Sequence, residues 1–249
     1  MREETRPLVS CICLTHNRVD ILRRSVQCFQ DQTYSNKELI VGFDEENREA
    51  AKFLATLRDP SIKPLVFQPD ITISLGEKRN SAIRLASGFY FCVWDDDDWH
   101  NMTRLETQVK SMAGTSLRSS VLSRIILYDG KTGHAYVSAI RWGWEQTLLC
   151  EKSLLIDSDL RYENRDRGED SSLIYNLRQM GLLLATPAPE LYIYVYHGNN
   201  IFHRGHWEVN LLPWAQQLST DTSGVVQKIL DGKLDSHAAS AILKQVLSR

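Results

Sequence analysis

Apolar runs alternate with mixed polar segments along the first 113 residues of the chain. Short runs rich in β-branched and aromatic residues are typical of buried strands, and apolar residues spaced three and four apart are typical of helices. The pattern predicts strands at 8–14, 37–44, 62–68 and 89–94, separated by helices at 20–30, 45–59 and 76–87. Pro64 marks the third strand as a sheet edge, because proline lacks a backbone N–H. This alternation predicts an α/β fold with a parallel sheet wrapped by helices.

The alternation ends after Gly114. Strand-like runs, SSVLSRIILYDG, HAYVSAIRW and ELYIYVYHG, surround a mixed segment at 168–181, and two short helical stretches lie in the tail from about residue 220. The sequence contains no internal repeat, low-complexity segment or obvious linker. We therefore predict one domain over residues 1–249, made of two halves, 1–113 and 114–219, and a helical tail, 220–249.

Composition narrows the classes of function. Of the 249 residues 43% are hydrophobic, which suffices for a sizeable core, and the formal net charge is -2. The chain therefore lacks the basic field that drives general nucleic-acid binding. The first ten residues lack the apolar core of a signal peptide, and no apolar run approaches the ~20 residues of a transmembrane segment. We expect a soluble, cytoplasmic protein whose five cysteines are reduced core residues.

Four consecutive aspartates, Asp95 to Asp98, follow the predicted strand at 89–94. Adjacent carboxylates repel one another unless a cation lies among them. In an extended chain, Asp95 and Asp97 would face one way, and Asp96 and Asp98 the other. Carboxylates are hard oxygen ligands suited to Mg²⁺ or Mn²⁺, and such an ion often completes its shell with water and substrate phosphate. The cluster therefore predicts a divalent cation and a bound diphosphate.

A structural role explains this cluster less well. Asp97 or Asp98 could cap a helix predicted within 99–112, but one cap accounts for one aspartate only. The Asp-x-Asp-x-Thr pattern of a class of phosphatases is absent, since Trp99 and His100 occupy the next positions. Polar clusters also follow the first and second strands, THNR at 15–18 and DEEN at 44–47. Ligands bind beyond the carboxyl ends of parallel strands, so the three clusters are expected to form one site.

Several motifs together resemble a known family. VSCICLTHNR, ELIVGFDEEN and SLGEKRNSAIRLASGFYFCVWDDDDW are similar, in order and spacing, to the nucleotide-sugar-binding half of the family-2 inverting glycosyltransferases of the GT-A fold. GED at 168–170 and YHGNN at 196–200 resemble that family's acceptor-side motifs. The resemblance implies a GT-A fold, which is Rossmann-like with a mostly parallel central sheet flanked by helices and a smaller, mixed acceptor-side part.

The resemblance assigns residues to the donor nucleotide. Thr15, His16 and Asp44 would hold the base and ribose, and a carboxylate suits a uracil N–H or ribose hydroxyls because charge-assisted hydrogen bonds are strong. Arg79 would meet a uracil carbonyl or a phosphate. His16 stands where many relatives have Tyr, and an ordinary loop histidine is the alternative. Lys78 is interpreted as a solvated charge on the helix surface.

The resemblance also assigns metal ligands. The family's Asp-x-Asp element is best placed at Asp95 and Asp97, with Asp96 near the ribose or phosphate. His197 resembles the family's late histidine near the metal, and neutral imidazole is a good ligand for Mn²⁺. A turn histidine, or a member of a separate cluster with two histidines further along the chain, is the alternative.

An inverting transfer needs a base on the side of the sugar opposite the leaving group. That base takes the proton of the acceptor hydroxyl as its oxygen attacks the anomeric carbon. Glu169 and Asp170 are the candidates, and the resemblance favours Asp170. An acid pair in the first turn of a helix is the structural alternative.

These assignments predict a metal-dependent inverting glycosyltransferase, hexosyl or N-acetylhexosaminyl, that uses Mn²⁺ or Mg²⁺. It would move a sugar from a nucleotide diphosphate donor, best matched by a UDP-sugar, to an acceptor hydroxyl of unidentified class. A diphosphatase or nucleotidyltransferase could share the acidic cluster but would not need the GED and HGNN motifs. A non-catalytic nucleotide-sugar-binding protein would not need the carboxylates of Asp95, Asp97 and Asp170. If the acceptor is lipid-linked, we expect the protein at the membrane periphery.

Overall fold

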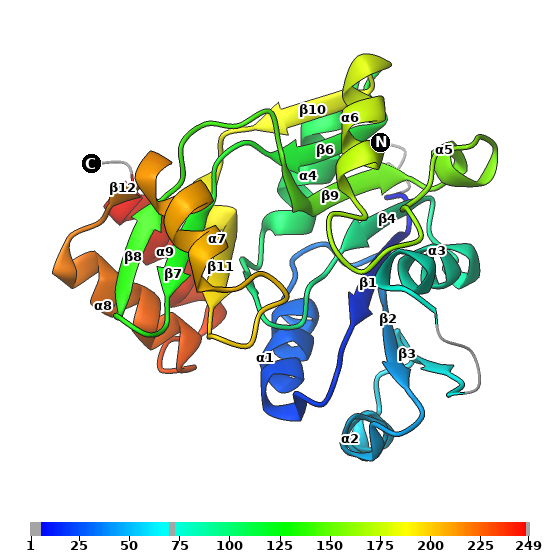
Figure 1. Cartoon of the computed structure of the whole chain (residues 1–249), viewed down its shortest axis with the longest axis horizontal. Helices are drawn as coiled ribbons and strands as arrows, with labels where there is room; N and C mark the ends of the chain where they lie inside the picture. Colours follow the sequence, from blue (N-terminus) through cyan, green and yellow to red (C-terminus); the bar gives the residue numbers. More distant parts are fainter. Residues whose placement is uncertain (1–5, 70–72, 248–249) are drawn as a thin grey trace, which may run out of the picture.

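The computed structural model describes residues 6–69 and 73–247, and within them the strands form two sheets (Figure 1). The larger sheet has the strand order β10 (Leu183–Thr186), β6 (Ser119–Leu122), β9 (Trp144–Glu151), β4 (Tyr90–Val93), β1 (Val9–Leu14), β2 (Lys37–Asp44) and β3 (Ile62–Phe67). The smaller sheet has the order β12 (Gln216–Gln217), β8 (His134–Val137), β7 (Ile126–Asp129), β11 (Tyr192–Tyr196) and β5 (Trp99–His100).

Helices cover both faces of the larger sheet, because successive side chains of each strand point to opposite faces. On one face lie α1 (Val19–Gln30), α2 (Arg48–Thr56) and α4 (Arg104–Met112), and on the other α3 (Leu75–Leu85), α5 (Ser153–Ile156) and α6 (Ser171–Gln179). Further along the chain are α7 (Arg204–His206), a π-helical turn (Trp207–Leu211), a 3₁₀ turn (Leu212–Trp214), α8 (Thr220–Leu230) and α9 (Ser236–Leu247). No helix in the described ranges is long and apolar enough to cross a membrane.

The pairing of strands in the larger sheet is mostly parallel. β1 runs parallel to β2 and β4, β2 runs parallel to β3, and β10 runs parallel to β6, whereas β9 is antiparallel to both of its neighbours. The predicted α/β fold, with a mostly parallel central sheet between helices, is confirmed. Three strands of this sheet lie after residue 113, so both predicted halves contribute to it. The division of the chain into functional halves stays a prediction.

The sequence pattern does not predict β9, which inserts between β4 and β6. Glu145 and Gln146, near the start of β9, are polar and line a pocket. The apolar run that would mark a strand therefore begins only at Leu148 and is short. The mixed segment at 168–181 forms a loop followed by α6. The helix predicted at 45–59 is shorter, because the Asn47 side chain caps α2 by accepting a hydrogen bond from the backbone N–H of Ala50 (3.2 Å).

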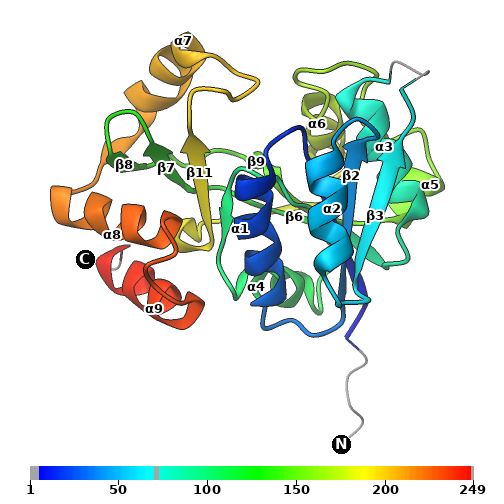
Figure 2. The same ribbon diagram turned by 90° about the horizontal axis from the view of Figure 1, so that it is seen from below.

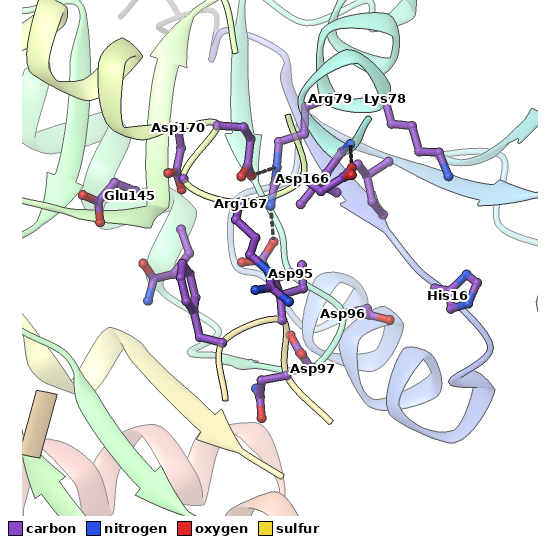
Figure 3. A pocket seen from close by; sticks show the side chains of 18 of the residues that line it. His16, Lys78, Arg79, Asp95, Asp96, Asp97, Glu145, Asp166, Arg167 and Asp170 are labelled. Atoms are coloured by element: carbon purple, nitrogen blue, oxygen red, sulfur yellow. Dashed lines mark hydrogen bonds and ion pairs between the residues drawn. The ribbon is translucent and has the colours of Figure 1, made fainter. Parts of the chain in front are cut away.

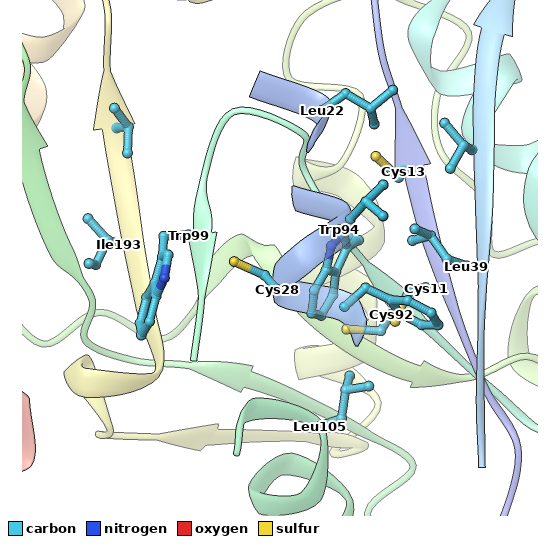
Figure 4. Packing of buried hydrophobic residues seen from close by; sticks show 14 of the residues in the cluster. Cys11, Cys13, Leu22, Cys28, Leu39, Cys92, Trp94, Trp99, Leu105 and Ile193 are labelled. Atoms are coloured by element: carbon cyan, nitrogen blue, oxygen red, sulfur yellow. The ribbon is translucent and has the colours of Figure 1, made fainter. Parts of the chain in front are cut away.

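One apolar cluster joins the two sheets (Figure 4). Trp99 of β5 and Ile193 of β11 belong to the same cluster as Cys11 of β1 and Leu39 of β2. All five cysteines lie in the described part of the chain, where they are buried and free of disulfides, as expected for reduced core residues. The position of the smaller sheet against the larger one is therefore set by a shared core.

The four aspartates form the turn between the two sheets, because β4 ends at Val93 and β5 begins at Trp99. Their side chains do not alternate, so that prediction is wrong: the backbone turns where an extended chain was expected. Asp95, Asp96 and Asp97 line a pocket, whereas Asp98 is buried and accepts hydrogen bonds from the Val195 backbone N–H (2.8 Å) and the Tyr192 hydroxyl. Capping is not their role either, since α4 begins at Arg104 with Thr103 before it.

Asp98 thus ties the turn to β11, and its replacement should destabilise the protein. Asp98→Ala leaves the Tyr192 hydroxyl and the Val195 N–H buried without an acceptor, at about 1–3 kcal/mol for each group. We expect the free energy of unfolding in urea to fall by about 2–4 kcal/mol. Asp98→Asn keeps one acceptor oxygen and should recover part of the loss. An Ala variant as stable as the wild type would show that this connection does not hold the sheets together.

Candidate active site

A pocket of about 850 Å³ lies where the carboxyl ends of β1, β2 and β4 meet (Figure 3). Segments far apart in the sequence line it: the loop after β1, the start of α3, the aspartate turn, the start of β9, the loop before α6 and the loop after β11. Nine of the ten predicted site residues line the pocket: Thr15, His16, Asp44, Arg79, Asp95, Asp96, Asp97, Glu169 and Asp170. The tenth, His197, contacts the pocket-lining Asp97.

Arg18 supplies the positive charge at the aspartate turn. Its Nη2 atom lies 2.5 Å from Asp96 Oδ1, and its Nη1 atom lies 2.8 Å from Asp97 Oδ2. Burial raises the pKa of Asp96 to about 7, repulsion from Asp97 adds to the rise, and Arg18 opposes it. Sequence reasoning did not assign this residue, although it ends the THNR cluster at the first strand. Its guanidinium bridges two of the adjacent carboxylates.

His197, at the end of β11, joins the same group. Its Nε2 atom lies 3.1 Å from Asp97 Oδ2 and 3.3 Å from Arg18 Nη1. Its Nδ1 atom accepts a hydrogen bond from the Asn199 backbone N–H (3.3 Å). Burial would raise the pKa of Asp97, but His197 and Arg18 hold it below its ordinary value.

The later histidines make other contacts. His203 accepts a hydrogen bond from the Gly205 N–H at the start of α7, and the His206 ring stacks on Phe202 (4.3 Å between centroids). The contacts of His197 among the described residues are with Arg18, Asp97 and its own loop. They do not include His203 or His206, so the alternative of a separate histidine cluster is not supported.

Arg79 connects the turn to the acceptor-side motif. Its Nη2 atom donates to Asp95 Oδ1 (3.1 Å), and its Nε atom donates to Glu169 Oε1 (3.2 Å). Its Nη1 atom is buried without a hydrogen-bond partner in the described structure. Thr15 was expected to contact the nucleotide, but in this structure its hydroxyl donates a hydrogen bond to Asp96 Oδ2 (2.6 Å). Arg79 thus links the turn to Glu169, and Thr15 orients a carboxylate.

Asp44, the last residue of β2, pairs with Lys78 of α3. The interpretation of Lys78 as a solvated surface charge is wrong, because the first turn of α3 faces the pocket and the Lys78 side chain is only 20% exposed. His16 is exposed, with its Nδ1 atom 3.6 Å from Asp44 Oδ2. The end of β2 therefore presents a carboxylate with a cation on one side and an imidazole on the other.

Asp170 lies across the pocket from the aspartate turn. It directly precedes α6, but its side chain makes no capping hydrogen bond to that helix. Glu145 of β9, which sequence reasoning missed, lies on the same side of the pocket (Figure 3). Burial raises the pKa of Asp170 to about 6, repulsion from Glu145 adds to the rise, and Arg79 opposes it. Glu169 instead pairs with Arg79, so only Asp170 of the two predicted acids presents a carboxylate without an ion-pair partner in the described structure.

The donor atoms fit a divalent cation that is only partly held by protein. Asp97 Oδ2 and His197 Nε2 are 3.1 Å apart, and both atom types are ligands for Mn²⁺. Among the residues that the structure describes, no group of three or more His, Cys, Asp or Glu side chains is arranged to hold a metal ion. A site with two protein ligands would leave the other positions to water and phosphate oxygens. Asp95, the other aspartate predicted to bind the metal, pairs with Arg79 (3.1 Å), and its metal role stays a prediction.

Sequence comparison identifies the family. Residues 10–163 match the model of the family described as Glycosyl transferase family 2. The chain belongs to glycosyl transferase family 2. The matched range covers the loop after β1, Asp44, Arg79 and the aspartate turn, whereas Glu169, Asp170 and His197 lie beyond it. The suspected family is therefore confirmed, and the roles of the acceptor-side residues rest on geometry.

Curated relatives of this family-2 chain match over part of its length. It is 30% identical over 112 residues to the uncharacterized glycosyltransferase MJ1057 of Methanocaldococcus jannaschii, covering 44% of this chain and 39% of that protein. It is 27% identical over 105 residues to the Escherichia coli UDP-Glc:alpha-D-GlcNAc-diphosphoundecaprenol beta-1,3-glucosyltransferase WfaP, covering 42% and 41%. The chain thus spans about two fifths of the length of these relatives.

Solved glycosyltransferases share the fold of this family-2 chain. The mannosyltransferase PcManGT from Pyrobaculum calidifontis, in complex with GDP-Man and Mn²⁺, superposes with a TM-score of 0.60 at 16% identity, covering 81% of this chain and 60% of that one. S. aureus TarS 1-349, in complex with UDP-GlcNAc, superposes with a TM-score of 0.64 at 15% identity, covering 78% and 60%. The predicted GT-A-type fold is confirmed by these matches.

The bridge made by Arg18 should contribute to stability. Arg18→Ala leaves two adjacent, largely buried carboxylates without their cation, and breaking a buried pair costs about 3 kcal/mol. Because this guanidinium is 27% exposed, we expect a smaller loss, about 2 kcal/mol, in the free energy of unfolding at pH 7 without divalent cations. The exposed Arg58→Ala is the matched control and should change stability by less than about 0.5 kcal/mol. Equal stability of the two variants would contradict this role of Arg18.

Proposed function

We propose that this chain is a metal-dependent inverting glycosyltransferase that moves a sugar from a UDP-sugar to an acceptor hydroxyl. The observation that carries the proposal is one pocket with a partly buried Asp170, without an ion-pair partner in the described structure, on one wall and the Asp97–His197 pair on another. A diphosphatase or nucleotidyltransferase would need no base positioned for an acceptor. UDP is favoured over other nucleotides because the names of WfaP and of the TarS complex contain UDP-sugars.

Donor binding would use residues at the ends of β2 and β4. Asp44, between Lys78 and His16, can accept hydrogen bonds from the base or ribose. The guanidinium of Arg79, which lines the pocket, would meet a phosphate oxygen. A divalent cation, Mn²⁺ or Mg²⁺, held by Asp97 and His197 would stabilise the negative charge of the leaving nucleotide diphosphate. Arg18 now occupies one oxygen of Asp97 and would have to release it.

Asp170 would act as the general base. Its carboxylate takes the acceptor proton while the acceptor oxygen attacks the anomeric carbon from the side opposite the diphosphate, which inverts that carbon. A pKa of about 6 leaves Asp170 mostly ionised at pH 7 while making it a stronger base than an ordinary aspartate. Glu169 would hold Arg79 in place through its ion pair.

The acceptor is proposed to be a lipid-linked sugar. WfaP and WfgD of Escherichia coli are both named as glucosyltransferases acting on alpha-D-GlcNAc-diphosphoundecaprenol. These relatives are 27% and 30% identical to this chain over 105 residues each. Their names favour a lipid-linked acceptor over a soluble glycan, a protein or a nucleic-acid base.

Activity should depend on an ionised Asp170. Asp170→Asn should lower turnover by about 10²-fold or more, without loss of affinity for UDP. Because the base works only when deprotonated, kcat/KM of the wild type should rise with pH through about 6. Glu145→Gln removes the repulsion that helps to raise this pKa, so its acidic midpoint should shift to lower pH. Full activity of Asp170→Asn, or an unmoved midpoint in Glu145→Gln, would assign the base elsewhere.

Metal binding can be tested without turnover. Calorimetric titration of UDP in the presence of Mn²⁺ should show weaker binding for Asp97→Asn and for His197→Ala, because each loses a proposed ligand. Arg18→Ala should bind Mn²⁺ more tightly than the wild type, since its guanidinium competes for Asp97. The exposed Glu49→Gln on α2 is the control for a simple loss of negative charge. Unchanged Mn²⁺ dependence in all three site variants would refute the assigned ligands.

A further inference from the structure

Exposed large apolar side chains gather in two short segments of the chain. Of the twelve such residues in the described structure, six lie at 140–142 and 201–214. We call these six residues the apolar rim: Ile140, Trp142, Ile201, Phe202, Val209 and Trp214. Ile140, Val209 and Trp214 are 71%, 69% and 68% exposed. Scattered apolar residues are normal on a protein surface, but a local concentration marks an interaction site.

Contacts join the two segments into one surface. The guanidinium of Arg141 donates a hydrogen bond to the backbone carbonyl of Asn210 (2.8 Å), which ties the loop after β8 to the π-helical turn. Trp142 lies against the guanidinium of Arg178 on α6, 5.5 Å from its ring centroid. In the view of Figure 2, α7 and α6 lie at the same end of the molecule, with α9 toward the other end. The rim therefore runs from α6 to the turns that follow α7.

The rim borders the acceptor side of the pocket. Ile201 and Phe202 line the pocket, as do Arg141 and His206, and the wall continues through Glu145 to Asp170. A molecule docked on the rim would therefore lie next to the proposed base.

The rim segments contain more arginines than acidic residues, although the whole chain carries -2. The segments 138–143, 171–180 and 199–214 contain three arginines and one glutamate. Arg204 pairs with that glutamate, Glu208, and with Asp129 (2.7 Å each), whereas Arg141 and Arg178 each lie against a tryptophan ring. Exposed tryptophan and aliphatic side chains beside arginines are typical of surfaces that lie at a lipid headgroup layer.

We propose that the apolar rim docks on the surface of an anionic lipid bilayer and brings the pocket to a lipid-linked acceptor. The inference rests on the proposed function for its acceptor, but the docking itself needs no turnover. Ile140, Val209 and Trp214 enter the boundary between headgroups and acyl chains, and Arg141 and Arg178 face lipid phosphates. A bilayer is favoured over a protein partner because it presents the acceptor hydroxyl at the pocket.

Co-sedimentation of the whole chain with vesicles tests this surface. The wild type should bind vesicles of phosphatidylcholine with phosphatidylglycerol, and bind pure phosphatidylcholine less, with the difference shrinking at high salt. The triple variant Ile140→Ser, Val209→Ser and Trp214→Ser should partition at least about tenfold less, because it loses three apolar side chains from the interface. Arg178→Gln should reduce the preference for the anionic vesicles.

The matched control replaces three exposed apolar residues outside the rim. Val66→Ser, Leu85→Ser and Ile156→Ser together should leave vesicle binding unchanged. Equal binding by the rim variant and the wild type, or no binding by the wild type, would overturn the proposal. So would sedimentation showing a wild-type dimer that the rim variant loses, since a second copy would then cover the surface.

A calorimetric measurement of UDP binding separates this proposal from the proposed function. The rim variant should bind UDP with Mn²⁺ as the wild type does, because none of its three substitutions lies among the donor residues. If the wild type binds vesicles and the rim variant does not, while neither binds UDP, the docking surface stands and the proposed transferase function fails. If UDP binds but the vesicles do not, the reverse holds.

Discussion

The guanidinium of Arg18 between Asp96 and Asp97 is the interaction on which the site depends. Two adjacent carboxylates that leave water repel one another and lose hydration, so the turn is stable only with a cation inside it. Arg18 lies at the start of α1, and the turn lies between β4 and β5. Their pairing fixes the loop after the first strand against the joint of the two sheets. The pocket is formed at that joint.

The other aspartates of the turn extend this arrangement in two directions. Asp95 reaches α3 through Arg79, and Asp98 reaches β11 through a backbone hydrogen bond and the Tyr192 hydroxyl. The turn thus contacts the start of α1, α3 and β11, so it positions the proposed donor side and the proposed acceptor side together. A cation that took Asp97 from Arg18 would act on a bond that also holds α1 to the turn, and its binding would therefore be linked to the packing of α1.

The sequence predicts what depends on local pattern. The strands β1, β2 and β4 follow from apolar runs, and the position of the site follows from polar clusters at their carboxyl ends. Arg18 and Lys78 could not be assigned, because a basic side chain in a loop or a first helical turn has the same local pattern whether or not a carboxylate from another segment meets it. β9 and its Glu145 were missed for a related reason: a strand inserted from a distant segment is recognised only by the neighbours that it pairs with.

The two walls of the pocket differ in how their charges are satisfied. On the donor wall, Asp44, Asp95, Asp96 and Asp97 all pair with cationic side chains. On the proposed acceptor wall, Asp170 is partly buried, is repelled by the Glu145 carboxyl and has its pKa raised from 3.8 to about 6. A rise of that size means that ionised Asp170 costs the folded protein about 3 kcal/mol at neutral pH, a cost that disappears as the pH falls below its ordinary pKa. Because Asp170 has no ion-pair partner in the described structure, it stays ready to take up a proton. The missing counter-charge is therefore what makes the acceptor wall suited to general-base catalysis, because an arginine beside Asp170 would lower its pKa and weaken it as a base.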